Sequence, residues 1–218
     1  MYPKANNGFV MDEKYWDALY GETYDIDGVF NAKQHASYVK ALFALMETKV
    51  QSLGDFGFGK AALLREFVKA FKPARVLAVE PSPERVEELR SKAWIEKVHI
   101  QIHNSNLQDF NPPYLKYAPM DLIICNSVFQ YMEDKDVKKV AEKLSKSTRF
   151  LYFTVPTKKD YLRMKKQIAF SDPYAYARST QFYRKILSKH FNFVSFNLLE
   201  SKYQLPSVFE EELFRFWI

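Results

Sequence analysis

Short apolar runs alternate with segments of helical periodicity along most of this chain, and that alternation limits the fold more than any other feature of the sequence. The runs have the length and composition of buried strands, and they lie at residues 50–55, 75–80, 98–102, 121–125 and 150–155. Between them, apolar residues recur three or four positions apart, as on a helix that packs against a sheet. Strands separated by helices form a parallel sheet that is covered on both faces and binds ligands at the carboxyl ends of its strands. We therefore expect an α/β fold with a three-layer, Rossmann-like sheet.

The composition fits a single domain spanning residues 1–218. Hydrophobic residues make up 47% and aromatic residues 17% of the chain, enough to bury one substantial core. The only cysteine, Cys125, lies in the apolar run LIIC, where we expect a buried thiol that cannot form an internal disulfide. We expect a cytoplasmic protein without membrane contacts, because the chain shows neither the apolar core of a signal peptide nor a run long enough to cross a bilayer. No metal is expected, and a net charge of +6 permits an acidic partner such as RNA without favouring one.

The segment SLGDFGFGKAALL predicts a strand, a tight turn and a helix. Gly57 and Gly59 allow the turn unusual backbone dihedrals and let a ligand approach the main chain closely. The amides at the start of the helix then favour an anionic group. Such a turn by itself fits a nicotinamide or flavin enzyme equally well. The neighbouring side chains are therefore needed to distinguish between these ligands.

Two carboxylates flank this turn and narrow the choice of ligand. Asp55 ends the first strand, where a dinucleotide-binding fingerprint ordinarily has glycine; it would repel a pyrophosphate but can hold the ammonium of an amino acid. Glu80 ends the second strand, where a carboxylate can accept hydrogen bonds from both hydroxyls of a ribose. A ligand with an amino acid at one end and a nucleoside at the other, such as S-adenosylmethionine, suits both carboxylates.

Four motifs, in this order, resemble those of the class I S-adenosylmethionine-dependent methyltransferases, particularly the group that acts on small molecules. LGDFGFGKA resembles the family's Asp-x-Gly-x-Gly turn, and AVEPSPERVEEL resembles its ribose-binding acid with the helix that follows. SNLQDF resembles the adenine-side loop, and MDLIICNSVFQYMED resembles the fourth strand with its substrate-facing loop. The resemblance spans about residues 48–155 and implies a seven-stranded, mostly parallel sheet with an antiparallel final strand. It also implies that residues 191–200 and 211–218 are the sixth and seventh strands.

The resemblance implies S-adenosyl-L-methionine as the cofactor and a set of cofactor-binding residues near the strand ends. These are Asp55, Gly57, Gly59, Glu80, Pro81, Asn106, Leu107 and Asn126. Three positions depart from the family pattern: Ala61 replaces the third glycine, Phe58 is bulkier than expected, and Asn106 replaces the adenine-side acid. An asparagine carbonyl can still accept a hydrogen bond from the adenine amino group. Poor binding of the cofactor, or binding without catalysis, is therefore one alternative for this chain.

The segments outside the motifs are expected to cover the pocket. We expect residues 1–48 to form a helical N-terminal extension and residues 156–180 to form a substrate-cap insertion, which is longer than a bare crossover requires. No catalytic residue is assigned, because alignment and water exclusion can drive methyl transfer without an indispensable base. His35 is a candidate base or an ordinary polar residue on a helix face. Tyr24, together with Tyr20, is a candidate for a lid or for ordinary aromatic packing.

The word NPPY at residues 111–114 resembles the active site of amine-methylating methyltransferases, in which it directly follows the fourth strand. Here it precedes the expected fourth strand, residues 121–125. Paired prolines also lack amide donors and hold the chain extended, so the motif has a structural explanation. We therefore expect NPPY to be structural.

The sequence predicts S-adenosylmethionine-dependent methyl transfer to a small-molecule acceptor by in-line displacement. An RNA methyltransferase is one alternative, because the Lys, Arg and Tyr residues interleaved in residues 157–185 can contact phosphates and stack on bases. The same pattern also describes an amphipathic helix, and no RNA-binding fingerprint accompanies it. A non-catalytic protein that binds S-adenosylmethionine or S-adenosylhomocysteine is the other alternative. The acceptor, its reacting atom and the oligomeric state stay open.

Overall fold

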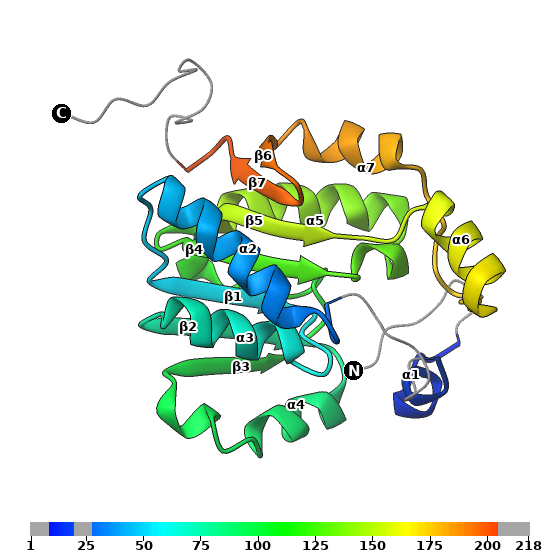
Figure 1. Ribbon diagram of the computed structural model, residues 1–218, viewed down its shortest axis with the longest axis horizontal. Helices are drawn as coiled ribbons and strands as arrows, with labels where there is room; N and C mark the ends of the chain where they lie inside the picture. Colours follow the sequence, from blue (N-terminus) through cyan, green and yellow to red (C-terminus); the bar gives the residue numbers. More distant parts are fainter. Residues whose placement is uncertain (1–8, 20–27, 205–218) are drawn as a thin grey trace.

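The computed structural model describes residues 9–19 and 28–204, and its centre is a seven-stranded sheet with helices on both faces (Figure 1). The strands are β1 Ser52–Phe56, β2 Arg75–Glu80, β3 Ile100–Asn104, β4 Met120–Asn126, β5 Thr148–Thr154, β6 Phe191–Ser195 and β7 Leu198–Ser201. They lie in the order β3-β2-β1-β4-β5-β7-β6. Strands β1 to β5 are parallel, whereas β7 runs antiparallel to both of its neighbours. The predicted Rossmann-like α/β sheet with an antiparallel final strand is confirmed.

Helices cover the two faces of the sheet in separate groups. The α-helices are α1 Glu13–Leu19, α2 Ala32–Leu45, α3 Ala62–Phe71, α4 Pro83–Arg90, α5 Asp134–Ser147, α6 Lys158–Ile168 and α7 Thr180–Leu187; the 3-10 helices are η1 Ile95–Lys97, η2 Pro113–Lys116 and η3 Phe129–Tyr131. Successive side chains of a strand point to opposite faces. In β2, Val76 joins the apolar cluster that includes α2, α3 and α4, whereas Leu77 joins the cluster that includes α5 and α7. Because both of their faces are buried, the inner strands β4 and β5, together with β2, are mostly apolar runs in the sequence.

The third strand lies two residues later than the sequence predicts. It spans residues 100–104 rather than 98–102. Val98 belongs to the end of η1, because its amide donates a hydrogen bond to Ile95 O (3.0 Å). Pairing of Cα partners with β2 begins only at Ile100. The apolar run therefore starts before the strand, because it also includes the residue that closes a helical turn.

The end of the sheet also differs from the expectation. Residues 191–200, expected as one strand, form the hairpin of β6 and β7; residues 211–218, expected as the seventh strand, lie outside the described residues. Phe196 and Asn197 connect the two strands, and Asn197 has a left-handed φ of 60°. Asparagine adopts this conformation more readily than most residues, which permits a tight turn inside an apolar run.

The NPPY motif lies at the end of the sheet where the parallel strands begin. Pro113 and Tyr114 begin η2, which precedes β4, so the predicted order is confirmed. The hydroxyl of Tyr114 donates a hydrogen bond to Oε1 of Gln101 in β3 (3.1 Å). Arg75, at the start of β2, donates to Ala118 O (3.1 Å) in the segment that leads into β4. These contacts fix the entry of the chain into the sheet, at the opposite end from the carboxyl termini of the parallel strands.

Three further features bear on the sequence expectations. Cys125 is a buried free thiol in β4, and burial raises its pKa far above the ordinary value. Among the described residues, no helix combines the length and the apolar character needed to span a membrane. Within the same ranges, no group of three or more His, Cys, Asp or Glu residues is arranged to hold a metal ion.

Candidate functional site

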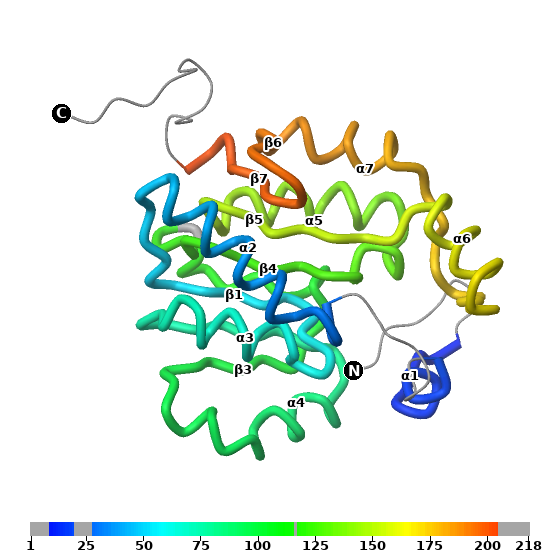
Figure 2. Tube along the Cα trace, viewed as in Figure 1, coloured from blue at the N-terminus to red at the C-terminus, as the bar shows by residue number. Residues whose placement is uncertain are grey.

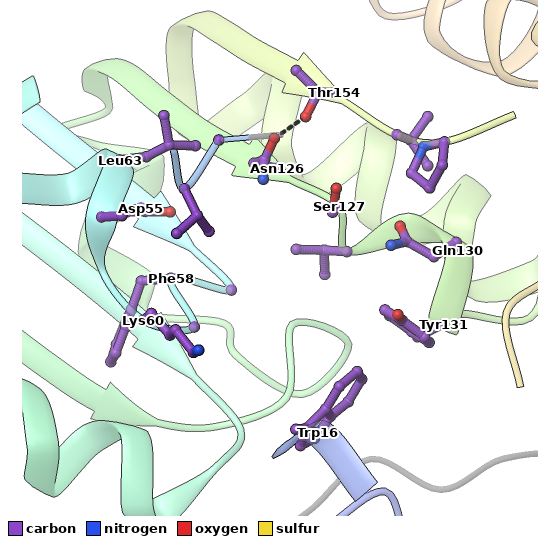
Figure 3. A pocket seen from close by; sticks show the side chains of 18 of the residues that line it. Trp16, Asp55, Phe58, Lys60, Leu63, Asn126, Ser127, Gln130, Tyr131 and Thr154 are labelled. Atoms are coloured by element: carbon purple, nitrogen blue, oxygen red, sulfur yellow. Dashed lines mark hydrogen bonds between the residues drawn. The ribbon is translucent and has the colours of Figure 1, made fainter. Parts of the chain in front are cut away.

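A cavity of about 900 Å³ opens at the carboxyl ends of β1, β2, β4 and β5 (Figure 3). The chain crosses from β1 to β2 and β3 on one side and then returns to β4 on the other, so this is the switch point where α/β sheets bind ligands. All eight residues predicted to bind a cofactor line the cavity: Asp55, Gly57, Gly59, Glu80, Pro81, Asn106, Leu107 and Asn126. The sheet thus brings together side chains and backbone from four separate turns.

Gly57 and Gly59 both have the left-handed dihedrals for which glycine is suited. Gly57 has a φ of 87°, and a Cβ there would lie only 2.4 Å from Cγ2 of Val128. Its amide donates to Val79 O (2.7 Å), which fixes the turn against β2. Gly59 has a φ of 50°, and a Cβ there would meet no heavy atom within 4 Å. Gly57 is therefore required for packing, whereas Gly59 leaves open space beside the backbone.

Glu80 connects the turn after β1 to the turn after β2. Its Oε2 accepts a hydrogen bond from the Gly59 amide (2.9 Å), and its Oε1 accepts one from the Ser82 amide (3.0 Å). Burial raises the pKa of Glu80, an effect that these two amides and the positive charge of Arg85 oppose. Each carboxylate oxygen keeps a second lone pair that can accept from a ligand. The protein itself therefore supplies partners that the sequence could not identify.

Asp55, at the end of β1, is 2% exposed and lies at the same end of the cavity as Glu80. Burial raises its pKa well above the ordinary value, the negative charge of Glu80 raises it further, and a backbone amide at Leu64 opposes both effects. A positively charged group bound beside these two carboxyls would be stabilised by both. We call this part of the cavity, with Asp55, Glu80 and the glycine turn, the carboxylate end.

The loop after β3 carries Asn106 and Leu107 and is held from behind by Lys143 of α5. The Lys143 ammonium donates hydrogen bonds to three backbone carbonyls: Leu107 O, Gln108 O (3.2 Å) and Phe110 O (2.6 Å). Burial lowers the pKa of Lys143 to about 8. Sequence reasoning missed this residue, because a lysine in an amphipathic helix looks like an ordinary surface residue.

Asn126, at the end of β4, is fixed by two neighbours that the sequence did not indicate. Its Oδ1 accepts a hydrogen bond from the hydroxyl of Thr154 in β5 (Figure 3). Gly28, with a φ of 84°, lies against the Asn126 amide, since a Cβ at Gly28 would come within 2.8 Å of Nδ2. Only glycine fits this approach without displacing the amide.

The opposite end of the cavity is lined mainly by aromatic and apolar side chains, and we call it the aromatic end; α6 also contributes the paired charges of Asp160 and Arg163 to the cavity wall. The aromatic end comprises Trp16 of α1, Gln130 and Tyr131 of η3, Met164 and Ile168 of α6, and Phe170. Figure 3 shows Trp16, Gln130 and Tyr131 across the cavity from Asp55 and Lys60. The rings of Trp16 and Tyr131 contact each other edge to face, with their centroids 4.9 Å apart.

Asp172 holds the aromatic end together. Its carboxylate accepts hydrogen bonds from the hydroxyls of Tyr15 (2.6 Å) and Tyr131 (2.8 Å) and from the amides of Tyr174 and Ala175. Figure 2 shows α1 and α6, far apart in sequence, at the same end of the molecule. Trp16 carries no sequence signal, and the motif MDLIICNSVFQYMED includes Gln130 without distinguishing it from its neighbours, because each becomes part of the site only through packing.

The two candidate catalytic residues are not part of the described cavity wall. His35, in α2, does not line it; its Nδ1 is 2.5 Å from the hydroxyl of Tyr152 in β5. Tyr24, like Tyr20, lies outside the described residues.

The departures from the family pattern have local explanations. Phe58 lines the cavity but is only 6% exposed, because it packs in the core with residues of α3. Ala61 precedes α3 in a left-handed conformation with a φ of 57°. This conformation explains why glycine suits the position, and alanine adopts it at a modest cost.

Comparisons with known proteins agree with this geometry. Residues 54–149 match a family described as a methyltransferase domain. The matched range contains all eight of the residues predicted to bind a cofactor. Among curated protein sequences, none matches this chain.

Several solved structures share the fold. One is an S-adenosylmethionine-dependent methyltransferase from Clostridium acetobutylicum ATCC 824, with 14% identity, a TM-score of 0.62 and coverage of 84% of this chain and 87% of that chain. Another is magnesium protoporphyrin IX methyltransferase from Synechocystis PCC 6803 with bound S-adenosylhomocysteine, with 19% identity, a TM-score of 0.58 and coverage of 85% and 91%.

The fold is also similar to that of the plantazolicin methyltransferase BpumL, solved with a monoazolic desmethylplantazolicin analogue and S-adenosylhomocysteine. The identity is 12%, the TM-score is 0.61, and the alignment covers 75% of this chain. It covers 64% of that protein, so this chain spans less than two thirds of its length. At such identities the similarity is one of fold.

Proposed function

We propose that this chain is a class I S-adenosylmethionine-dependent methyltransferase with a small-molecule acceptor, a function that its matching domain and its fold support. S-adenosylmethionine carries a methyl group on a positively charged sulfur. In the proposed reaction, an acceptor atom forms a bond to the methyl carbon in line with the carbon–sulfur bond as that bond breaks, and S-adenosylhomocysteine leaves. The observation that carries the proposal is a single cavity with two chemically different ends.

The carboxylate end fits this cofactor. Asp55 and Glu80 are buried acidic groups, and the methionine half of the cofactor carries positive charge on its ammonium and its sulfur. We assign Asp55 to the ammonium and Glu80 to the ribose hydroxyls. These hydroxyls can donate hydrogen bonds to the free lone pairs of the Glu80 carboxylate oxygens. Gly59 leaves room for the cofactor, and we assign Asn106, which lines the cavity, to the adenine amino group.

The aromatic end suits a small acceptor. A volume of about 900 Å³ is large enough for a small ligand beside the cofactor, since such pockets typically have roughly 300–1,000 Å³. We propose that residues 1–48 and 156–180 act as its cover, because Trp16, Met164 and Phe170 line this end. Small-molecule acceptors are also consistent with two of the three structures of similar fold, a magnesium protoporphyrin IX methyltransferase and a plantazolicin methyltransferase. The buried free thiol of Cys125 fits the reducing cytoplasm, which we propose as the location.

RNA is the second candidate acceptor, on one observation. Helix α6 carries exposed basic residues beside the cavity: Lys158, Lys159, Arg163, Lys165 and Lys166. Phosphate binding by these residues would weaken steeply as salt is raised. With a fluorescent single-stranded RNA of mixed sequence, we expect no binding at physiological salt beyond the non-specific level. Tight, salt-sensitive binding that S-adenosylhomocysteine strengthens would favour RNA instead.

Thermal melting tests the proposed cofactor. S-adenosylhomocysteine should raise the melting temperature, and a concentration 100 times its Kd stabilises the folded protein by about 2.7 kcal/mol. NAD should have no effect, because Asp55 repels its pyrophosphate. Equal stabilisation by NAD, or none by S-adenosylhomocysteine, would contradict the assignment. Release of S-adenosylhomocysteine on a panel of acceptors then tests turnover.

A further inference from the structure

Gln130 has an unusual environment for a polar residue at a cavity wall. Its side chain has 0% exposure, and neither Nε2 nor Oε1 has a hydrogen-bond partner among the described residues. It nevertheless belongs to the lining of the cavity, and Figure 3 shows it between Ser127 and Tyr131 at the aromatic end. A buried carboxamide can make several hydrogen bonds, and this one makes none with residues 9–19 and 28–204.

The backbone of η3 does not need this side chain. The main-chain carbonyl of Gln130 accepts a hydrogen bond from the Tyr176 amide (2.8 Å). The Tyr131 side chain is fixed separately by its hydrogen bond to Asp172. An apolar side chain of the same length would fill the position without leaving polar atoms unsatisfied. The glutamine therefore costs the folded protein free energy, and a structural role does not explain it.

We propose that the Gln130 carboxamide recognises the acceptor through a pair of hydrogen bonds, in which Nε2 donates and Oε1 accepts. This inference rests on the proposed function. The complementary group carries an N–H donor beside a carbonyl acceptor, as a carboxamide or a lactam does. A carboxylate would satisfy Nε2 but leave Oε1 without a donor, and a ketone would do the same.

The surrounding walls indicate the rest of the acceptor. Trp16, Tyr131 and Phe170 offer aromatic surface at the same end, against which a flat apolar body can pack. Of the acidic residues that line the cavity, Asp55 and Glu80 lie at the other end, and Asp160 already accepts hydrogen bonds from Thr157 and Arg163, so they do not compete for this ligand. The acceptor class is therefore a planar, largely apolar molecule with an amide-type edge.

Wild-type protein saturated with S-adenosylhomocysteine gives the first test. Benzamide has a flat ring with an amide edge, acetophenone lacks the N–H donor, and benzoate lacks a donor at neutral pH. Measured by ligand-observed NMR titration, benzamide should bind at least tenfold more tightly than either. Failure of benzamide to bind, or equal binding of the three, would overturn the inference. If S-adenosylhomocysteine does not bind, the proposed function itself is contradicted. If it binds but benzamide does not, only the inference about Gln130 is contradicted.

The variant Gln130→Met gives the second test, with Gln181→Met as the matched control on the exposed surface of α7. Gln130→Met should lower benzamide affinity at least tenfold and leave S-adenosylhomocysteine affinity within twofold. Its melting temperature without ligand should equal or exceed that of the wild type, because an unsatisfied buried amide is removed. A structural role for Gln130 predicts a lower melting temperature instead. That result, or unchanged benzamide binding, would overturn the inference.

Discussion

The two ends of the cavity are built in different ways. The carboxylate end consists of short turns directly after β1 and β2, in which Asp55, Gly57 and Glu80 lie within a few positions of a strand end. The aromatic end is assembled from α1, η3 and α6, and the Tyr15–Asp172 hydrogen bond there joins residues 157 positions apart. Local turns thus form the carboxylate end, to which we assign the cofactor, whereas long-range packing forms the aromatic end, to which we assign the acceptor. The aromatic end can therefore change without altering the turns of the carboxylate end.

The electrostatic character of the two ends differs in the same way. At the carboxylate end, burial and the proximity of two acids raise the pKa of Asp55, so a cationic ligand is favoured. At the aromatic end, the carboxylate of Asp172 is already used by two tyrosine hydroxyls and two amides. Variants at one end should therefore change one ligand's affinity and spare the other's.

Glu80→Gln should have the largest effect on the carboxylate end. A neutral amide removes a charged acceptor of hydrogen bonds, so affinity for S-adenosylhomocysteine should fall by about 1.5–3 kcal/mol in calorimetry. Because Glu80 also accepts from the Gly59 and Ser82 amides, the melting temperature should fall as well. Glu87→Gln, on the exposed face of α4, is the control and should change neither quantity. Unchanged affinity in Glu80→Gln would remove the ribose role from this residue.

Lys143→Met tests whether the adenine-side loop depends on support from α5. Loss of the hydrogen bonds to Leu107 O, Gln108 O and Phe110 O should loosen the loop and weaken S-adenosylhomocysteine binding by about 0.5–1.5 kcal/mol. Benzamide binding at the aromatic end should stay the same. In the wild type, affinity for S-adenosylhomocysteine should decrease as the pH rises through about 8, because the amine has one donor fewer than the ammonium. If the affinity of Lys143→Met for S-adenosylhomocysteine depended on pH in the same way as that of the wild type, this role of Lys143 would be contradicted.

Asp55→Asn tests how the stability and the cofactor affinity of the carboxylate end depend on pH. The folded-state pKa of Asp55 lies above its unfolded value of 3.8, so the folded state takes up the proton first as the pH falls. Relative to the asparagine variant, the wild type should therefore gain stability as the pH falls through the folded pKa and lose it as the pH rises through that value. Its affinity for the cationic cofactor should change in the opposite direction, since protonation removes the charge. Melting temperatures and cofactor affinities, measured over a range of pH for both proteins, test the two trends. If both quantities depend on pH in the same way in the wild type and in Asp55→Asn, protonation of Asp55 does not cause them.

Asn111→Ala should have the smallest effect, because it lies at neither end of the cavity. Asn111 is exposed at the amino edge of the sheet, just before η2. We expect S-adenosylhomocysteine affinity within twofold of the wild type and a change in stability within about 0.5 kcal/mol, as is usual for surface substitutions. Once an acceptor is known, turnover should also be nearly unchanged. A large loss of turnover with intact stability would show that NPPY takes part in the reaction.

The sequence by itself determined the sheet and the carboxylate end. Alternating apolar runs, glycines at left-handed positions and acids at strand ends act over a few residues, so their consequences can be derived from neighbouring positions. The same local reasoning placed NPPY before β4. The family resemblance was wrong for residues 191–200, where Asn197 permits a turn within an apolar run.

Only the tertiary structure decided which partners the polar side chains have. Lys143 meets Phe110 O across 33 positions of sequence, and Glu80 meets the Gly59 amide across 21. In the part of the chain that the structure describes, the same packing gives the Gln130 side chain no hydrogen-bond partner. The physical reason is that hydrogen bonds and burial depend on how distant segments pack, and neither residue type nor local periodicity encodes that packing.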